Sequence, residues 1–192
     1  KITYFSGKQE MLHLGVFNNI DAAMMVHSQA NCPERRLFVG GGGLGFAAKT
    51  IRFSGKEAHA GGAPHDGINA LNAASAAITM IGMQRETFRD EDKIRVHYII
   101  TKGGDSVNTV PADVRMELYV RGVSEAAIKN AEEKVDRAIH GAAYGIGASA
   151  EITTLGSYAP LCQNSELSRI FADNAKGLAD EICFGIDMIG ST

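Results

Sequence analysis

The sequence predicts an α+β fold whose centre is a ferredoxin-like βαββαβ unit, a four-stranded antiparallel sheet with two helices on one face. Two observations support this prediction. Four segments between residues 48 and 155 alternate apolar and polar side chains, as strands with one buried face do. Two longer segments among them place apolar residues three and four positions apart, as amphipathic helices do. Their order along the chain is strand, helix, strand, strand, helix, strand.

The strands are expected at 48–54, 94–101, 112–121 and 148–155. The third strand has the clearest pattern, because every second residue is apolar. These apolar residues are Val114, Met116, Leu118 and Val120. The residues between them are polar or aromatic, so one face of the sheet is expected to stay uncovered by the helices. The strand at 94–101 is apolar enough to pair with another chain if it lies at an edge.

The first helix is expected at 67–88 and the second after Ser124, which is a good N-cap residue. The second helix should end at Gly145 and Gly147. One apolar stripe runs along the first helix, formed by Ile68, Leu71, Ala74, Ile78 and Ile81. Both helices therefore have a single face to bury against the sheet.

The flanks of this unit have a different character. Gly40 to Gly43 form a flexible joint, with no Lys-Ser/Thr of a phosphate-binding loop after it. Residues 21–26 form an apolar run that predicts a buried strand ending at His27. Helical spacing returns after 160, followed by a short strand near 182–185. We expect 1–30 and the C-terminal segment to form a second, discontinuous unit into which the central unit is inserted.

Composition excludes several classes of function. The chain has 192 residues, a net charge of −3 and no cluster of Lys and Arg that could follow a phosphate backbone, so nucleic acid is not an expected partner. No apolar run is long enough to span a bilayer, and no membrane partner is expected. The three cysteines are odd in number and suit a reducing compartment, which predicts a cytoplasmic protein. The chain starts at Lys1 without a Met, and we expect a fragment of a longer enzyme.

Two histidines are candidates for function. His59 lies in a Gly-rich turn between the first strand and the first helix, and such braced loops often carry binding or catalytic groups. His27 follows the apolar run at 21–26, where open α/β sheets display ligands. From position alone, the favoured interpretation of His59 is an idle surface residue, and that of His27 is a hydrogen-bonded strand-end residue.

Five short features stand out together: His27, Gly-Lys-x-x-His-Ala at 55–60, Gly-x-Asn-Ala at 67–70, Gly-Gly-x-x-x-Asn-x-x-Pro at 103–111, and Val120-Arg121. In this order and spacing they resemble the dinuclear-metal amidohydrolase and exopeptidase family. That family contains aminoacylases, carboxypeptidase G, and hydrolases of indole-acetyl-amino acids and p-aminobenzoyl-glutamate. The resemblance covers almost the whole chain.

The resemblance implies an organisation for the chain. Residues 46–157 correspond to the family's lid and dimerisation domain, which predicts a homodimer through this segment. Residues 1–45, which include the Gly-rich hinge, and 158–192 correspond to parts of its α/β metallopeptidase catalytic domain. The implied reaction is cleavage of an N-acyl-amino acid or peptide-like amide by water. Two divalent ions, zinc or else manganese or cobalt, activate that water in the family.

The resemblance also implies roles for single residues. His27 matches a metal ligand, and His59 matches the lid histidine that reaches the scissile carbonyl in the partner subunit's active site. Asn108 and Arg121 match substrate-binding residues, and a guanidinium suits a carboxylate because it donates two parallel hydrogen bonds. The family's other ligands and its general base have no counterpart in this chain. We therefore expect this fragment to be inactive alone and to bind no metal tightly.

Two alternatives use the same fold. A free-standing ferredoxin-like dimer could bind a small effector, because such folds host many functions. A single-stranded RNA binder would need aromatic platforms and a basic face on the central strands. Phe53 and Tyr119 are the only aromatics expected on those strands, and the net charge is negative.

Overall fold

The computed structural model describes residues 7–27 and 35–185, which form two compact units. One unit comprises the described residues from Gly43 to Leu161. The other comprises those up to Gly42 and from Cys162 onward. The chain passes from one to the other just after the glycines at 40–42 and again at Cys162.

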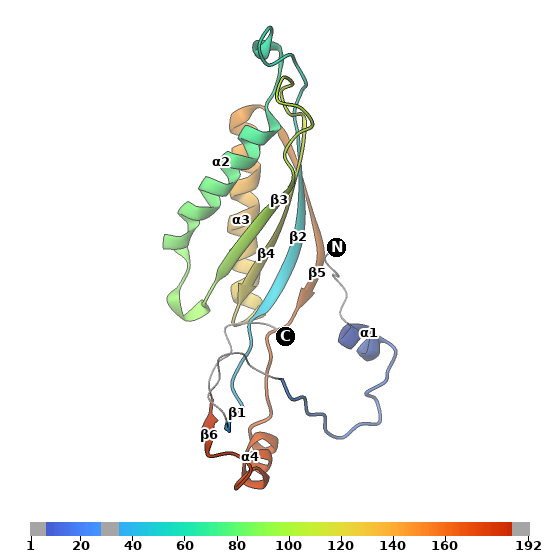
Figure 1. Ribbon diagram of the computed structural model, residues 1–192, viewed down its shortest axis with the longest axis vertical. Helices are drawn as coiled ribbons and strands as arrows, with labels where there is room; N and C mark the ends of the chain where they lie inside the picture. Colours follow the sequence, from blue (N-terminus) through green and yellow to red (C-terminus); the bar gives the residue numbers. More distant parts are fainter. Residues whose placement is uncertain (1–6, 28–34, 186–192) are drawn as a thin grey trace. The chain divides into compact units, whose positions relative to one another are not determined.

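The Gly43–Leu161 unit has the predicted βαββαβ order, with both helices on one face of the sheet (Figure 1). Its elements are β2 (Gly45–Ser54), α2 (Ala70–Met83), β3 (Arg95–Lys102), β4 (Asp113–Gly122), α3 (Glu125–Ile146) and β5 (Ser149–Tyr158). Short 3-10 turns occupy Pro64–Asp66, Gln84–Thr87 and Asp90–Asp92. The four strands are antiparallel and ordered β3-β4-β2-β5, which leaves β3 and β5 at the edges of this sheet. The predicted fold class is thus confirmed.

The helices begin and end where local chemistry favours it. The Asn69 side chain accepts hydrogen bonds from the N–H groups of Leu71 and Asn72 and caps α2. Ser124 caps α3 by accepting from Ala127 N–H at 3.1 Å. Gly147 ends α3 with φ 81°, a left-handed conformation that glycine adopts without strain. The first helix is shorter than the predicted 67–88, because it starts only after its cap at Asn69 and the chain turns into a 3-10 helix at Gln84.

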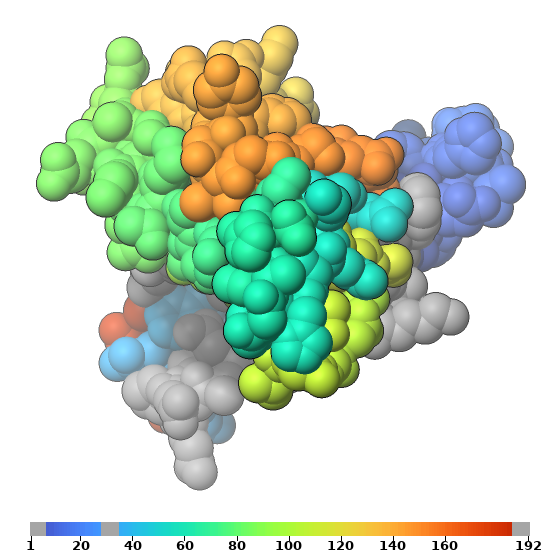
Figure 2. Space-filling view, turned by 90° about the horizontal axis from the view of Figure 1, so that it is seen from above, coloured from blue at the N-terminus to red at the C-terminus, as the bar shows by residue number. Residues whose placement is uncertain are grey.

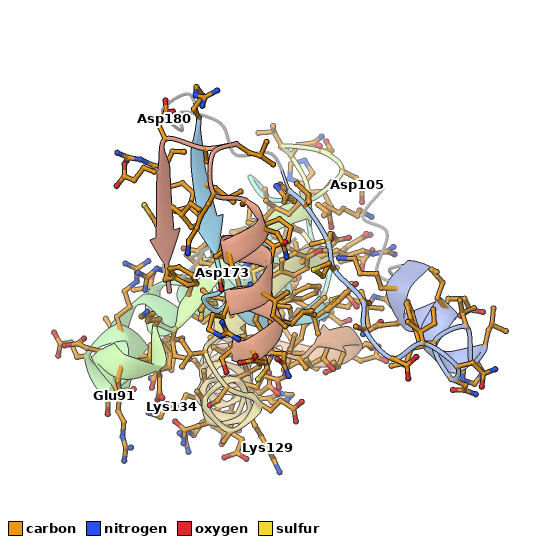
Figure 3. All side chains as sticks on the ribbon, turned by 90° about the horizontal axis from the view of Figure 1, so that it is seen from below. Glu91, Asp105, Lys129, Lys134, Asp173 and Asp180 are labelled. Atoms are coloured by element: carbon orange, nitrogen blue, oxygen red, sulfur yellow. The ribbon has the colours of Figure 1, made fainter. Side chains whose placement is uncertain are left out.

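The core lies between the sheet and the two helices. The sheet contributes large side chains and the helices contribute mostly alanines, which let the helices lie close to the strands. The largest fully buried side chains are Phe53, Ile51, Met116, Ile139, Val114, Val120 and Val135. Lys134 of α3, labelled in Figure 3, donates to Thr87 O at 2.6 Å and so contacts the 3-10 turn that follows α2.

One charged side chain is buried under α3. Lys49 of β2 is 3% exposed, and its Nζ lies 2.7 Å from Asp136 Oδ2 and 3.1 Å from Glu132 Oε1. Both carboxylates are on α3 and partly exposed. A buried ammonium requires such partners, because leaving it unpaired would cost several kcal/mol, roughly, in lost hydration. The ion pairs therefore join the helix to the sheet.

The other unit contains α1 (Gly7–His13), β1 (Arg36–Val39), α4 (Ser165–Asn174) and β6 (Glu181–Phe184). The strands β1 and β6 pair in parallel, although more than 140 residues separate them. Arg35 Nε donates to Asp180 Oδ1 at 2.8 Å beside this pair, and Figure 3 labels Asp180 there. The predicted helix and short strand near the C-terminus are both present.

The predicted strand at 21–26 is wrong. Residues 21–27 are irregular and exposed, with Met24 64% and Val26 80% accessible. An apolar run forms a strand only where a neighbouring strand can take its backbone hydrogen bonds, and the described residues offer none. In the described part of the chain, no helix is long and apolar enough to cross a membrane.

Candidate functional site

His59 lies in a turn that leaves the end of β2 and is tied to the backbone around it. Lys56 and Ile68 exchange two backbone hydrogen bonds of 2.9 Å, which close the base of the turn. Further out, the turn pairs with the connection between β3 and β4. Ala60 N–H donates to Asn108 O at 2.8 Å, and Val110 N–H donates to Ala58 O at 2.9 Å. The two connections lie side by side beyond the same end of the sheet (Figure 2).

The His59 ring has a defined tautomer. Gly62 N–H donates to His59 Nδ1 at 2.9 Å, so Nδ1 is an acceptor and the neutral ring carries its proton on Nε2. Gly61 and Gly62 pack beside the ring, and a methyl group on Gly62 would come within 3.3 Å of it. The side chain is exposed. This arrangement presents a fixed N–H donor to a ligand.

Asn108 lies next to His59 through the backbone pairing. Thr109 is directly opposite His59, and Asn108 is the residue before it. The Ser106 hydroxyl donates to Asn108 Oδ1, so the amide NH₂ of Asn108 points away from Ser106. Asp105, labelled in Figure 3, pairs with Lys102 at 3.1 Å at the start of the same connection. The structure thus brings two of the predicted site residues, His59 and Asn108, onto one pair of turns.

Arg121 lies at the opposite end of the same sheet. The His59 turn starts where Gly55 N–H bonds to Ala112 O, just before the first residue of β4, Asp113. Arg121 is eight residues further along this strand, which is about 26 Å at the usual rise per residue. Arg121 and His59 of one chain therefore cannot contact the same small molecule.

Arg121 is held by aromatic and imidazole groups on the helix-free face of the sheet. Its Nε donates to His97 Nε2 at 3.0 Å. Its guanidinium carbon lies 5.4 Å from the Phe46 ring centroid and 5.3 Å from that of Tyr119. Phe46 stacks on Tyr119 at 4.9 Å and contacts Tyr158 at 5.3 Å. Phe46 and Tyr158 lie opposite each other on neighbouring strands, as do His97 and Tyr119.

His97 was not among the predicted site residues. Partial burial, and then the positive charge of Arg121, lower the pKa of His97 below its usual value. The strand pattern did place His97, Tyr119 and Arg121 on the polar side of their strands. It did not show that they are neighbours, because that depends on the register of β3 against β4. The signal in the sequence was a histidine, an aromatic residue and an arginine on the polar side of two neighbouring strands.

His27 lies in the exposed segment at 21–27, away from regular structure. Across the described ranges 7–27 and 35–185, no three His, Cys, Asp or Glu side chains come together as a metal site. The described residues therefore do not form a dinuclear metal centre by themselves. Cys162 and Cys183 carry free thiols, and Cys32 lies outside the described residues.

The comparison with protein families identifies the Gly43–Leu161 unit. A family model described as the M20 peptidase dimerisation domain matches residues 43–146, more than half of the chain. The chain belongs to the M20 peptidase family. The resemblance inferred from the motifs is confirmed, and the M20 dimerisation domain is the unit that carries His59, Asn108 and Arg121.

Individual relatives extend the match beyond this domain. Xaa-Arg dipeptidase of Mus musculus is 29% identical over 91% of this chain and 39% of its own length. Indole-3-acetyl-aspartic acid hydrolase of Enterobacter agglomerans is 30% identical over 79% of this chain and 34% of its own length. A crystal structure of an aminobenzoyl-glutamate utilization protein from Klebsiella pneumoniae shares the fold, with a TM-score of 0.75 and 24% identity over 94% of this chain and 47% of that one. The chain thus spans little more than a third of the length of the dipeptidase and of the indole-3-acetyl-aspartic acid hydrolase.

Proposed function

We propose that this chain is the lid and dimerisation part, with adjoining pieces of the catalytic domain, of a metal-dependent amidohydrolase or peptidase. Its substrate would be an N-acyl-amino acid or a dipeptide-like amide. The names of these two relatives each describe an amino acid joined to another group, arginine in the dipeptidase and aspartic acid in the hydrolase. A free-standing binding domain is not favoured, because the first relative matches 91% of this chain and so extends over both flanks.

The observation that carries this proposal is the fixed tautomer of His59. Gly62 N–H occupies Nδ1 at 2.9 Å, so the Nε2–H is the donor that an acyl carbonyl oxygen would meet. A donor held in place stabilises the negative charge that develops on that oxygen in the transition state. Asn108, on the paired connection, would add its amide NH₂ to the same substrate. In this proposal His59 and Asn108 act only as hydrogen-bond donors, and neither serves as the nucleophile or the general base.

Arg121 would bind the carboxylate of the amino acid released by the reaction. Because about 26 Å separates its end of β4 from the end next to the His59 turn, one chain cannot supply both groups to one substrate. We infer that each active site takes Arg121 from one protomer and His59 with Asn108 from the other. This requires a homodimer through residues 46–157, and the unpaired edge of β3 is the proposed contact.

The metal centre would lie in the catalytic domain, to which residues 1–45 and 158–192 would contribute. His27 is our candidate ligand in this chain, and zinc, manganese or cobalt are the candidate ions. The fragment by itself would be inactive. A cytoplasmic location remains a prediction from the cysteine content.

Mixed dimers of the full-length enzyme test the proposal. His59→Ala should lower kcat about 100- to 1,000-fold with little change in KM, as expected for one lost oxyanion donor. Arg121→Ala should act mainly by raising KM. When the two variants are mixed, one of the two sites in a heterodimer receives both intact residues. With substrate well below the raised KM of Arg121→Ala, activity should rise well above that of either variant.

Subunit exchange must be shown separately, for example by co-purifying two differently tagged variants. If heterodimers form and their activity stays at the level of the parents, His59 and Arg121 do not come from different subunits. A His59→Ala enzyme with normal kcat would contradict the donor role itself.

A further inference from the structure

The contact between His97 and Arg121 points to a role for a residue outside the proposed active-site set. Arginine is always protonated and its Nε can only donate, so His97 Nε2 at 3.0 Å must accept. The neutral His97 ring therefore carries its proton on Nδ1. Tyr119 meets the ring edge-on at a centroid distance of 5.4 Å, which limits its rotation.

These contacts fix the plane of the guanidinium. Phe46 and Tyr119 lie beneath it at 5.4 and 5.3 Å, and His97 holds its Nε–H. A carboxylate that binds Arg121 with two hydrogen bonds would then have to use the two Nη groups. Such paired hydrogen bonds depend on the orientation of the guanidinium more than a simple charge attraction does.

We propose that His97 is a positioning residue, which in its neutral form orients Arg121 for carboxylate binding and releases that orientation when it is protonated. This inference rests on the carboxylate-binding role proposed for Arg121. Protonation places N–H on Nε2, removes the acceptor and sets two positive charges side by side. Carboxylate binding at Arg121 should therefore weaken at acidic pH.

The charges around His97 predict a change in carboxylate affinity on protonation that is opposite to the change predicted by the positioning role. On the same face, the register places these titratable or charged side chains near it: Arg121, Tyr119 and Glu117 on β4, Arg95 on β3, and Tyr158 on β5. Because Arg121 and Arg95 are both positive, attraction by charge alone would make an anion bind more tightly when His97 gains a proton. The positioning role predicts the opposite change.

The lowered pKa of His97 gives the pH window. Its neutral form is favoured in the folded chain, so the change in binding should occur below the usual histidine pKa of about 6.5. Above that pH the contact with Arg121 is fully formed. As the pH falls through the lowered pKa, the contact is lost.

The test uses NMR of the ¹⁵N-labelled 192-residue chain, with N-acetylglycine as the carboxylate probe. Its neutral amide, N-acetylglycinamide, is the matched control. The dissociation constant, followed at the Arg121 Nε–H signal in a titration from about pH 7.5 to about pH 5, should rise roughly three- to tenfold between neutral and protonated His97, as for one lost hydrogen bond. The probe stays ionised throughout this range, since its carboxyl titrates near pH 4, roughly.

Two variants separate positioning from packing. In His97→Gln the amide oxygen can still accept from Arg121, so binding should persist at both pH values without the pH dependence. His97→Leu should bind weakly at both, and backbone amide spectra would show whether it folds. Tighter binding at the lower pH in the wild-type chain, or an Arg121 signal that ignores His97 titration, would overturn the proposal. If the Arg121 signal shifts as His97 titrates but never responds to the probe, the substrate-binding role of Arg121 is contradicted, while the hydrogen bond between His97 and Arg121 is supported.

Discussion

At the scale of single residues, Gly55 sets the geometry of the His59 turn. A methyl group at this position would lie 2.1 Å from the carbonyl oxygen of Ile68. That oxygen cannot simply move away, because it accepts from Lys56 N–H at 2.9 Å. We expect Gly55→Ala to lower the free energy of unfolding by about 1–3 kcal/mol, the usual cost of forcing an extra methyl group into a packed site. Urea unfolding followed by circular dichroism measures this.

Gly82→Ala is the matched control, because nothing lies within 4 Å of the added methyl group and the residue is inside α2. Alanine there should stabilise the helix by about 0.5–1 kcal/mol. The amide signals of residues 56–70 should move in Gly55→Ala and stay in place in Gly82→Ala. Equal stabilities of the two variants would show that the strand-to-turn approach at Gly55 is looser than described.

At the scale of elements, the ion pairs of Lys49 join α3 to β2. Asp136→Ala removes the closer carboxylate, 2.7 Å from the buried ammonium, and leaves Glu132 at 3.1 Å as its partner, so it should cost about 1.5–3 kcal/mol. Lys49→Met removes the buried charge, and its two former partners on α3 are partly exposed and can be hydrated. That change should cost less than about 1 kcal/mol, because apolar replacement of a buried ion is often neutral.

The control for this pair is Glu133→Ala, an exposed position on the same helix. It should be near neutral by the same urea measurement. If Lys49→Met destabilised the chain as much as Asp136→Ala, the ion pairs would be making a net favourable contribution that burial alone does not explain.

At the scale of the whole molecule, the β3 edge is the surface expected to pair with a second copy. The β3 strand is bonded to β4 on one side only, and it exposes Tyr98 at 38%, Ile99 at 56% and Ile100 at 40%. Ile99→Lys places a charge in this edge, which opposes strand pairing between chains. We expect the dimer dissociation constant to rise at least about tenfold, equivalent to about 1.4 kcal/mol.

Sedimentation velocity over a dilution series measures this change. Tyr144→Lys is the control, because Tyr144 is 87% exposed on α3 and lies outside the proposed contact. It should sediment as the wild-type chain does. An Ile99→Lys chain with an unchanged profile would move the dimer contact to another surface.

The sequence by itself determined the elements of the M20 dimerisation domain and the place of the turn that carries His59. Alternation gave the four strands within three residues at each end, and Ser124 and Gly147 marked the limits of α3. His59 was found because glycines and a strand-to-helix junction surround it in sequence. These features depend on residues a few positions apart, so a local pattern carries them.

The tertiary structure alone decided which of these residues lie close to one another. It placed Asn108 beside His59 and put Arg121 at the other end of the sheet, in contact with His97. It also left the apolar run at 21–26 without a partner strand among the described residues. Each result depends on which distant backbone groups pair. Alternation indicates the face of the sheet on which a side chain lies, but not which residues of the neighbouring strands lie beside it, because that depends on the register.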